Sequence, residues 1–553
     1  MGELTCFKAY DIRGEIGIDI DAGIAYRIGR AVAQHFDSTN VIVGRDARET
    51  SPEFARAVSQ GIMDAGADVL DIGLSGTEEM YWAVTEYYAN AGIIVTASHN
   101  PINYNGMKIV KSESKPLDDN SDFKEIKRLA ENNNWTDKIK LGTRSDITRD
   151  AREKYVNAIL KFVDVSKLKP LKIVVNSGNG AAGPTFDAIA DSLAKKGAPL
   201  DFIRVNHEPD STFPNGIPNP LLVENRPATA EIVIAEKANL GIAFDGDFDR
   251  CFFFDETGAF IGGEYILGLL ASSFLDKNPG SKIIHDPRVV WNIQNIVKCK
   301  GGKAIQSKTG HSFIKQAMRL NNAIYGGEMS AHHYFRDFSY CDSGMIPWLL
   351  ITELLSTSGI SLRNLVKSQF NAFPSSGENN FVVKDPEVAI NKVLHKYKSD
   401  AISIDETDGV SLTFENWRFN LRRSNNEPLV RLNIEGRGDK INIQKSDLNF
   451  FNSNLVPNLN IPKNTIEKEL EKTETATISK IKNYHIIAGA FINKSNAEKL
   501  NNSLMKTNFN SEIISSENGY YRVSYNSFYT KENAIIALEK IKIINKSAWI
   551  LTN

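Results

Sequence analysis

Apolar and polar positions alternate between helical and strand periods along the first 370 residues. Residues 23–36 have the spacing of an amphipathic helix, and residues 40–46 read as a buried strand that ends in a polar turn. A second helix is expected after this turn, with Ser51 as its N-cap and Pro52 in its first position, and a second strand over 67–74. Continuously apolar strands that alternate with helices predict a mainly parallel sheet covered on both faces.

The same pattern restarts twice, near residues 171 and 251, which predicts three successive α/β domains with parallel or mixed sheets. From about residue 370 the pattern of apolar and polar positions becomes typical of a β-rich α+β domain, with turns at Asp408-Gly409 and Ser424-Asn425. Asn, Lys and Glu dominate the next segment, which reads as a linker, and the last seventy or so residues follow a βαββαβ order. The expected boundaries are 1–145, 146–250, 251–368 and 369–452 for the four domains, 453–480 for the linker and 481–553 for the small module.

Composition limits the class of protein. The chain has 553 residues, a net charge of −2 and 42% hydrophobic residues, which excludes a globally basic nucleic-acid binder and a strongly acidic solvating chain. The cysteines Cys6, Cys251, Cys299 and Cys341 are scattered and form neither a disulfide framework nor a CxxC zinc pattern. No apolar run reaches the ~18 residues of a membrane span, and the N-terminal sequence lacks the apolar core of a secretory signal. We therefore expect a cytoplasmic protein without a membrane span.

The first candidate for chemistry is the run TASHNP at 96–101, which follows the apolar strand AGIIV. A serine in a loop at the carboxyl end of a parallel strand lies where ligands bind in α/β folds. Ser98 is thus a candidate nucleophile, although a loop serine can equally well cap the next helix. No GxSxG motif surrounds it, which disfavours a hydrolase triad.

The second candidate is the turn DGDFDR at 245–250, again directly after an apolar strand. Asp245, Asp247 and Asp249 alternate around a glycine, so their oxygens can converge on a hard cation such as Mg²⁺. An acidic surface turn is the plain alternative. A calcium loop is a second alternative because Glu256 stands at position twelve, but the apolar strand 251–254 and the lack of glycine at position six disfavour it.

Residues 178–183 match GxGxxG between a strand and a helix, with Asp201 about twenty residues further on. This is the pattern of a dinucleotide site, but Pro184 and the small residues also fit a tight strand-to-helix turn.

Two further clusters combine polar groups. Residues 327–333 hold a carboxylate and a hydroxyl that can bind vicinal sugar hydroxyls, whereas adjacent His332 and His333 point apart and do not suit a shared metal. Residues 422–428 offer a guanidinium, a hydroxyl and turn amides, a combination suited to phosphate.

Taken together, these motifs resemble the α-D-phosphohexomutase superfamily, and in particular its bacterial phosphomannomutases. Over about residues 1–440 they follow the family's order: KAYDIRG (8–14), GRDARETSPEF (44–54), TASHNP (96–101), NYNGMK (103–108), DGDFDR (245–250), SKTGH (307–311), GEMSAHHYF (327–335) and RRSNNEP (422–428). Asn426 departs from the threonine that is common in the family. The glycine run at 178–183 matches a turn of the family's second domain, which weakens the dinucleotide interpretation.

The resemblance implies a role for each matching residue. Ser98 would be a phosphoserine that gives its phosphoryl group to one end of a hexose phosphate and recovers a phosphate from the other end of the hexose 1,6-bisphosphate, which also serves as activator. Mg²⁺ would be held by Asp245, Asp247, Asp249 and the Ser98 phosphate. Arg13 and Lys108 would flank the phosphoserine, and Lys108 or His311 would move the hydroxyl proton. Substrate would be bound by Arg250, Arg288, Glu328, Ser330, His332, Arg422, Ser424 and Asn425.

The C-terminal module, 481–553, is similar to a SPOR (sporulation-related repeat) domain, on the segments HIIAGAF, NAEKL, YYRVSYNSF, KENAIIALEKIK and AWIL. Such domains bind septal peptidoglycan glycan strands, so these strands are an expected partner. The aromatic residues Phe491, Tyr521, Tyr525 and Phe528 are candidates for stacking on sugars, although alternate strand positions also suit a core. A peptidoglycan ligand conflicts with the expected cytoplasmic location.

The expected activity is the interconversion of mannose 6-phosphate and mannose 1-phosphate for GDP-mannose and polysaccharide synthesis. Two alternatives stay open: a dual phosphomannomutase/phosphoglucomutase, because no motif clearly reads the sugar O2, and a peptidoglycan-binding protein whose mutase part is an inactive scaffold.

Overall fold

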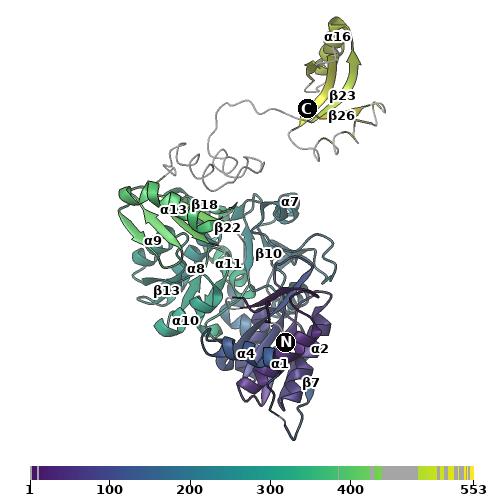
Figure 1. Ribbon diagram of the computed structural model, residues 1–553. Coiled ribbons are helices and arrows are strands. Elements are labelled where there is room, and N and C mark those ends of the chain that lie inside the picture. The colour runs from purple at the N-terminus through teal and green to yellow at the C-terminus, as the bar shows by residue number, and fades with distance from the viewer. Residues whose placement is uncertain are drawn as a thin grey trace. The chain divides into compact units, whose positions relative to one another are not determined.

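The structure is a computed structural model. It describes residues 3–8, 11–136, 138–383, 385–423 and 429–438, and then 484–506, 511–515, 521–528, 534, 538, 541–542, 545 and 548–552. The chain divides into two compact units, Met1–Ile461 and Pro462–Asn553. Each unit is described by itself (Figure 1).

The first sheet has the order β1-β5-β4-β2-β3-β7, with β6 paired to β5. Its centre is parallel, β4 with β2 and β2 with β3, whereas β5 runs antiparallel to β4. The elements are β1 (Ile12–Glu15), α1 (Ala22–His35), β2 (Asn40–Arg45), α2 (Ser51–Asp64), β3 (Asp68–Leu74), α3 (Thr77–Glu86), β4 (Ala91–Val95), β5 (Tyr104–Lys111), β6 (Lys115–Pro116), α4 (Asp122–Asn132) and β7 (Arg144–Asp146).

Helix α2 begins one residue away from the expectation. Thr50 is the N-cap, Ser51 is the first helical residue and Pro52 follows it. The Ser51 hydroxyl is not free to cap the helix because it donates to Asp46 Oδ1 at 2.5 Å.

The second and third sheets repeat this plan, with the orders β12-β11-β10-β8-β9 and β14-β13-β15-β16-β17. The second domain comprises α5 (Thr148–Ile159), β8 (Leu171–Asn176), α6 (Ala182–Lys195), β9 (Leu200–Val205), α7 (Pro227–Glu236), β10 (Leu240–Phe244), β11 (Cys251–Phe254) and β12 (Phe260–Ile261). The third comprises α8 (Gly263–Lys277), β13 (Lys282–His285), α9 (Trp291–Cys299), β14 (Lys303–Gln306), α10 (His311–Asn321), β15 (Tyr325–Gly327), β16 (His333–Phe335), β17 (Cys341–Asp342), α11 (Met345–Ser358) and α12 (Leu362–Ala372).

The three sheets place their key loops at equivalent points. In each, a strand with a parallel neighbour leads through a polar loop into an antiparallel strand: β4 to β5, β10 to β11 and β15 to β16. The loops are residues 96–103, 245–250 and 328–332. The prediction of three related α/β units is confirmed.

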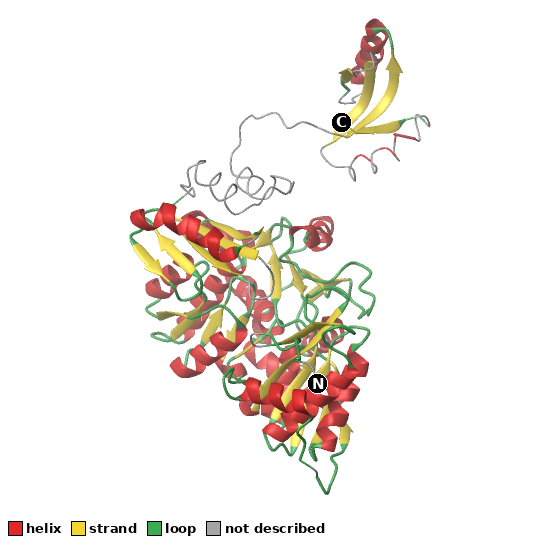
Figure 2. Cartoon of the chain, viewed as in Figure 1, coloured by secondary structure: helices red, strands yellow, loops and turns green. Residues whose placement is uncertain are grey.

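The fourth sheet is antiparallel throughout, in the order β18-β22-β21-β20-β19. It comprises β18 (Ser375–Val382), α13 (Pro386–Tyr397), β19 (Ser403–Asp405), β20 (Val410–Thr413), β21 (Trp417–Arg423) and β22 (Leu429–Gly436). Figure 2 shows this strand-rich region beside the helix-covered sheets of the first three domains. An α+β fourth domain was expected and is found.

The C-terminal unit is a four-stranded antiparallel sheet in the order β24-β25-β23-β26, with one described helix packed on it. Its elements are β23 (Tyr484–Phe491), α16 (Lys494–Lys506), β24 (Ile513–Ser515), β25 (Tyr521–Phe528) and β26 (Trp549–Thr552). Ile486, Val523 and Tyr525 are buried in its core, so the core interpretation holds for Tyr525. Most of the expected second helix lies outside the described residues.

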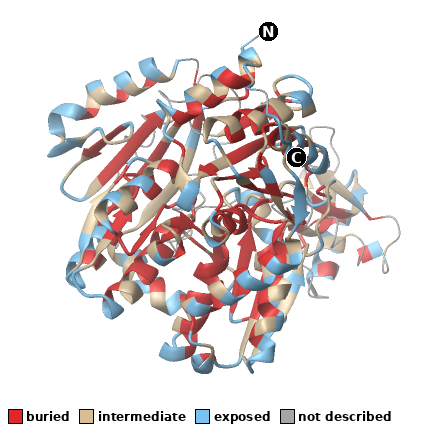
Figure 3. Ribbon diagram, turned by 90° about the horizontal axis from the view of Figure 1, so that it is seen from below, coloured by how far each residue is buried: buried red, intermediate tan, exposed pale blue. Residues whose placement is uncertain are grey.

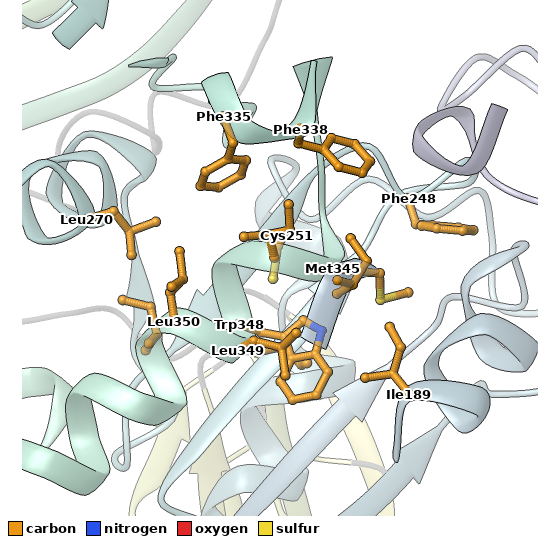
Figure 4. Close-up of a cluster of buried hydrophobic side chains, with 14 of the residues drawn as sticks. Ile189, Phe248, Cys251, Leu270, Phe335, Phe338, Met345, Trp348, Leu349 and Leu350 are labelled. Atoms are coloured by element: carbon orange, nitrogen blue, oxygen red, sulfur yellow. The ribbon is translucent and has the colours of Figure 1, made fainter. Parts of the chain in front are cut away.

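The main core of the first unit is continuous across the first three domains. Helix α11 supplies much of it: Met345 and Trp348 point into a cluster with Ile189, Phe248 and Cys251 (Figure 4). The central strands β4, β10 and β11 are buried along their whole length, whereas many exposed positions lie on the outer helices (Figure 3). Among the described residues, no single helix is both long and apolar enough to cross a membrane; α11 and α12 reach that length only together, with a bend of 100°.

Candidate active site

The serine loop connects β4 to β5. Ser98 is 5% exposed and has a left-handed backbone with φ of +49°, which is uncommon for a residue other than glycine. Its backbone N–H donates to Thr96 Oγ1 at 2.8 Å, and its hydroxyl donates to Asp245 Oδ2 at 3.0 Å. The loop hydroxyl and the acidic turn are therefore in direct contact, although 147 residues separate them in the sequence.

The acidic turn connects β10 to β11. Asp245, Asp247 and Asp249 are almost completely buried, and each contributes an oxygen to a group whose ligand atoms lie within 4.8 Å of one another. Within the part of the chain that the structure describes, Oδ1 of each carboxylate accepts no hydrogen bond, although His332 Nε2 lies 3.5 Å from that of Asp249. The side chain of Phe248, between two of these aspartates, anchors the turn in the core. Three buried carboxylates with unused oxygens fit a hard divalent cation such as Mg²⁺.

The calcium-loop alternative fails on topology. Strand β11 runs antiparallel to β10, and its Phe254 pairs with Gly241 near the start of β10. Glu256 therefore lies at the end of the hairpin opposite to Asp245 and cannot share a cation with it.

The dinucleotide alternative fails on space. A Cβ atom at Gly178 would lie 2.3 Å from Pro218, one at Gly180 would lie 2.8 Å from the Gly246 carbonyl oxygen, and one at Gly183 would lie 2.1 Å from the His207 carbonyl oxygen. The space beside the glycine run is occupied by the Pro218 side chain and by backbone, including that of the acidic turn, and not left open for a pyrophosphate.

Two cationic side chains compensate the acidic turn. Lys108 Nζ lies 2.7 Å from Asp247 Oδ2 and also contacts Asp249, and Arg250 Nε donates to Asp245 Oδ2 at 2.8 Å. Burial alone would lower the pKa of Lys108, but Asp247 and Asp249 hold it above its ordinary value. Burial raises the pKa of Asp245 to about 6, against the opposing effect of Arg250.

Arg13 and His311 meet at Asp11. Arg13 donates to the Thr96 carbonyl oxygen at 2.8 Å, beside the serine loop, and its Nη2 lies 3.6 Å from Asp11. His311, at the start of α10 in the third domain, has Nε2 3.3 Å from Asp11 Oδ1. Although burial opposes the change, His311 and Arg13 lower the pKa of Asp11.

The loop 328–332 brings the sugar-binding candidates to the acidic turn. His332 Nε2 lies 3.5 Å from Asp249 Oδ1, and its Nδ1 lies 3.3 Å from Glu328 Oε2. Burial opposes protonation of His332, but Asp249 and Glu328 raise its pKa to about 9. Arg288 donates to Ser330 Oγ at 3.1 Å and lies 3.4 Å from Glu328.

Glu378 links this group to the fourth domain. Its carboxylate lies 2.7 Å from Arg422, 3.3 Å from Arg431 and 3.5 Å from Arg288. Of the predicted phosphate grip, Arg422 is placed here, whereas Ser424 and Asn425 lie outside the described residues. Sequence reasoning missed Glu378, which stands in no motif that it singled out.

Family models match nearly the whole of the first unit. The alpha/beta/alpha domains I, II and III of phosphoglucomutase/phosphomannomutase match residues 5–137, 153–258 and 262–373, and the C-terminal domain matches 378–445. The chain belongs to the phosphoglucomutase/phosphomannomutase family. It also has a SPOR domain at residues 480–552, as the sequence predicted.

Relatives of this mutase family extend over about 440 residues. A phosphomannomutase of Escherichia coli K12 is 53% identical over 441 residues, which cover 79% of this chain and 96% of that protein. A Xanthomonas campestris protein described as phosphohexose mutases is 50% identical over 438 residues, with the same coverage of 79% and 96%. The crystal structure of a Burkholderia thailandensis family member superposes with a TM-score of 0.72 at 31% identity, covering 82% of this chain and 96% of that one. The mutase part is therefore an enzyme, and the inactive-scaffold alternative is not supported.

Proposed function

We propose that the protein interconverts mannose 6-phosphate and mannose 1-phosphate through a phosphoserine at Ser98 and a hexose 1,6-bisphosphate. One observation carries the proposal: the Ser98 hydroxyl lies 3.0 Å from Asp245, in a group of three buried aspartates that have unused oxygens. The names of the curated relatives support mannose phosphate as the substrate.

The transfer has two halves. In the first, a hydroxyl oxygen of the hexose monophosphate attacks the phosphorus of phospho-Ser98, the bond from phosphorus to Ser98 Oγ breaks, and the hydroxyl loses its proton. In the second, the bisphosphate is bound in the reverse orientation and Ser98 Oγ attacks the phosphorus of its other phosphate. The bond from that phosphorus to the sugar oxygen breaks, and the proton returns to this sugar oxygen. Such transfers depend on positioning and on neutralisation of charge more than on a strong base.

The residues of the chain divide these tasks. Asp245, Asp247 and Asp249 would hold Mg²⁺ together with the Ser98 phosphate, and the ion would neutralise charge on the phosphoryl oxygens. Arg250 lies beside Ser98 and Asp245, where its guanidinium can bind the transferring group. Lys108 and His311 remain the candidates for moving the proton.

Sugar and distal phosphate would be bound by the third and fourth domains. Glu328 and Ser330 present a carboxylate and a hydroxyl suited to vicinal sugar hydroxyls, with His332 and Arg288 beside them. Arg422, with Ser424 and Asn425, would bind the phosphate that does not react.

The decisive experiment replaces Ser98 by alanine. The variant should lose mannose phosphate interconversion by several orders of magnitude in a coupled assay supplied with Mg²⁺ and hexose 1,6-bisphosphate. Full activity in a preparation free of other mutases would refute the phosphoserine assignment. The same assay with glucose 1-phosphate decides between a mannose-specific enzyme and a dual mutase.

We also propose a location and a second ligand. We place the mutase part in the cytoplasm because its proposed substrates are hexose phosphates and because its four cysteines, three of them buried, are free, as is usual in a reducing compartment. The SPOR domain supports binding of peptidoglycan glycan strands through residues 481–553.

A further inference from the structure

Arg48 occupies an unusual place between β2 and α2. It belongs to the segment GRDARETSPEF, to which the proposed chemistry assigns no role, and it is only 3% exposed. Its guanidinium group points at the serine loop and not at the acidic turn or at the sugar-binding residues.

The guanidinium group makes four described hydrogen bonds, all to backbone carbonyl oxygens: three in the serine loop and one at Tyr104, the first residue of β5. Nη2 donates to the carbonyl oxygens of Ser98 and Asn100 at 3.0 and 2.5 Å. Nη1 donates to those of Pro101 and Tyr104 at 2.8 and 3.0 Å. The planar fork of a guanidinium group can satisfy four acceptors at once, whereas an ammonium group has three donors on one nitrogen and cannot reach all of them.

The guanidinium group is itself held from two domains. Asp46 Oδ1 accepts the backbone N–H of Arg48 at 3.0 Å, and Asp46 Oδ2 lies 3.5 Å from Arg48 Nε. The Asp46 backbone N–H donates to the carbonyl oxygen of Val95, the last residue of β4. In the second domain, the ring of Phe213 faces the guanidinium group, with 5.8 Å between Arg48 Cζ and the ring centroid.

The strained conformation of Ser98 explains what this network does. A left-handed residue other than glycine has a higher energy than an extended one, so it persists only where its surroundings fix it. The Ser98 carbonyl is fixed by Arg48 on one side and lies against Gly246 of the acidic turn on the other. We propose that Arg48 is a positioning residue that holds the serine loop in the conformation that directs Ser98 Oγ at the acidic turn.

This inference rests on the proposed function, and its test has one readout that does not. Arg48→Lys keeps the charge and loses the fork. Arg56→Lys is the matched control, because Arg56 lies on the exposed side of α2 and its described side-chain hydrogen bond goes to the Pro52 carbonyl oxygen within its own helix. Both variants are prepared as full chains, and circular dichroism verifies that they fold.

The first readout is hydrogen exchange of the backbone amides in residues 96–104. Loosening of the loop in Arg48→Lys should make this exchange about tenfold faster, while Arg56→Lys matches the wild type. Unchanged exchange in Arg48→Lys would overturn the inference, whatever the activity of the enzyme.

The second readout is steady-state kinetics. Because the sugar and distal phosphate are bound by other domains, Arg48→Lys should lower kcat by about 100-fold and leave KM within about threefold. A wild-type kcat, or a rise in KM without a fall in kcat, would also overturn it. If the wild type itself has no mutase activity, the proposed function fails and the exchange readout still decides the role of Arg48.

If Arg48→Lys does not fold, Phe213→Leu replaces it. Loss of the ring that covers the guanidinium group should lower kcat and accelerate exchange in the same segment, to a smaller extent. Unchanged values for both would contradict the inference.

Discussion

Replacing Gly246 by alanine would place a methyl group against the backbone of the serine loop. The new Cβ atom would lie 2.6 Å from the Ser98 carbonyl oxygen, whereas ordinary contacts begin at 3.4 Å, so one of the two segments must move by about 0.8 Å. The acidic turn cannot easily retreat, because the Gly246 carbonyl oxygen accepts the N–H of Ala181 at 3.1 Å and packs against Gly180. The displacement therefore falls on Ser98.

A displacement of that size should be costly to phosphoryl transfer. Misplacing a reacting group by about 1 Å lowers rates by roughly 100-fold, so we expect kcat of Gly246→Ala to fall by about that factor. KM for the hexose phosphate should change little, because the predicted sugar and phosphate contacts lie in other loops.

The assay is the coupled mutase reaction over a range of Mg²⁺ concentrations. Gly23→Ala is the control: Gly23 lies in the first turn of α1, far from both the serine loop and the acidic turn in the sequence, and the nearest atom to a new Cβ is the side-chain oxygen Oδ1 of Asp21 at 3.3 Å. A Gly246→Ala enzyme with wild-type kcat and wild-type Mg²⁺ dependence would refute the argument that close approach of these two loops builds the site.

Three further predictions concern stability and the C-terminal unit. Glu435 accepts from Arg418 and from the N–H groups of Val290 and Trp291, so Glu435→Gln leaves a buried guanidinium charge uncompensated and should lower the free energy of unfolding in urea by about 3–5 kcal/mol. The exposed Glu415→Gln is its control, and equal midpoints for the two variants would contradict the prediction. Burial lowers the pKa of His333 to about 3 from its ordinary value of 6.5, so the unfolded chain takes up the proton first and wild-type stability falls as the pH drops below about 6.5. Between pH 7 and pH 5 the free energy of unfolding of the wild type should fall by about 2 kcal/mol relative to that of His333→Gln. A difference in unfolding free energy that stays constant over this pH range would argue against the prediction. The full chain should be retained on peptidoglycan sacculi stripped of stem peptides, whereas a chain ending at Ile461 should not; equal retention would exclude the SPOR domain as the binding element.

The fold was predictable because its signals are local. Apolar strands such as 91–95 and 240–244 are followed at once by polar loops. These loops lie at the carboxyl ends of strands that have parallel neighbours, where ligands bind in α/β folds, so Ser98 and Asp245 could be chosen as candidate site residues from the sequence. Even the dinucleotide-like glycine run was correctly assigned to a turn, since Pro184 and the small residues gave a local reason for it.

The contacts that complete the site were not predictable in this way. Arg48 holds carbonyl groups 50 to 56 residues away, and Glu378 pairs with Arg288 in another domain. Backbone carbonyls carry no side-chain pattern, and Glu378 stands between ordinary strand residues. Only the three-dimensional arrangement reveals which carbonyl groups Arg48 binds and which arginine Glu378 pairs with.

The central claim is that Ser98 carries the phosphoryl group. The most direct test is the mass of the intact chain before and after phosphatase treatment, followed by mapping of the peptide that contains residues 96–101. The account predicts one phosphate, located on Ser98, which disappears on phosphatase treatment and returns on addition of hexose 1,6-bisphosphate with Mg²⁺. An active enzyme that carries no phosphate on this peptide at any stage of turnover would contradict it.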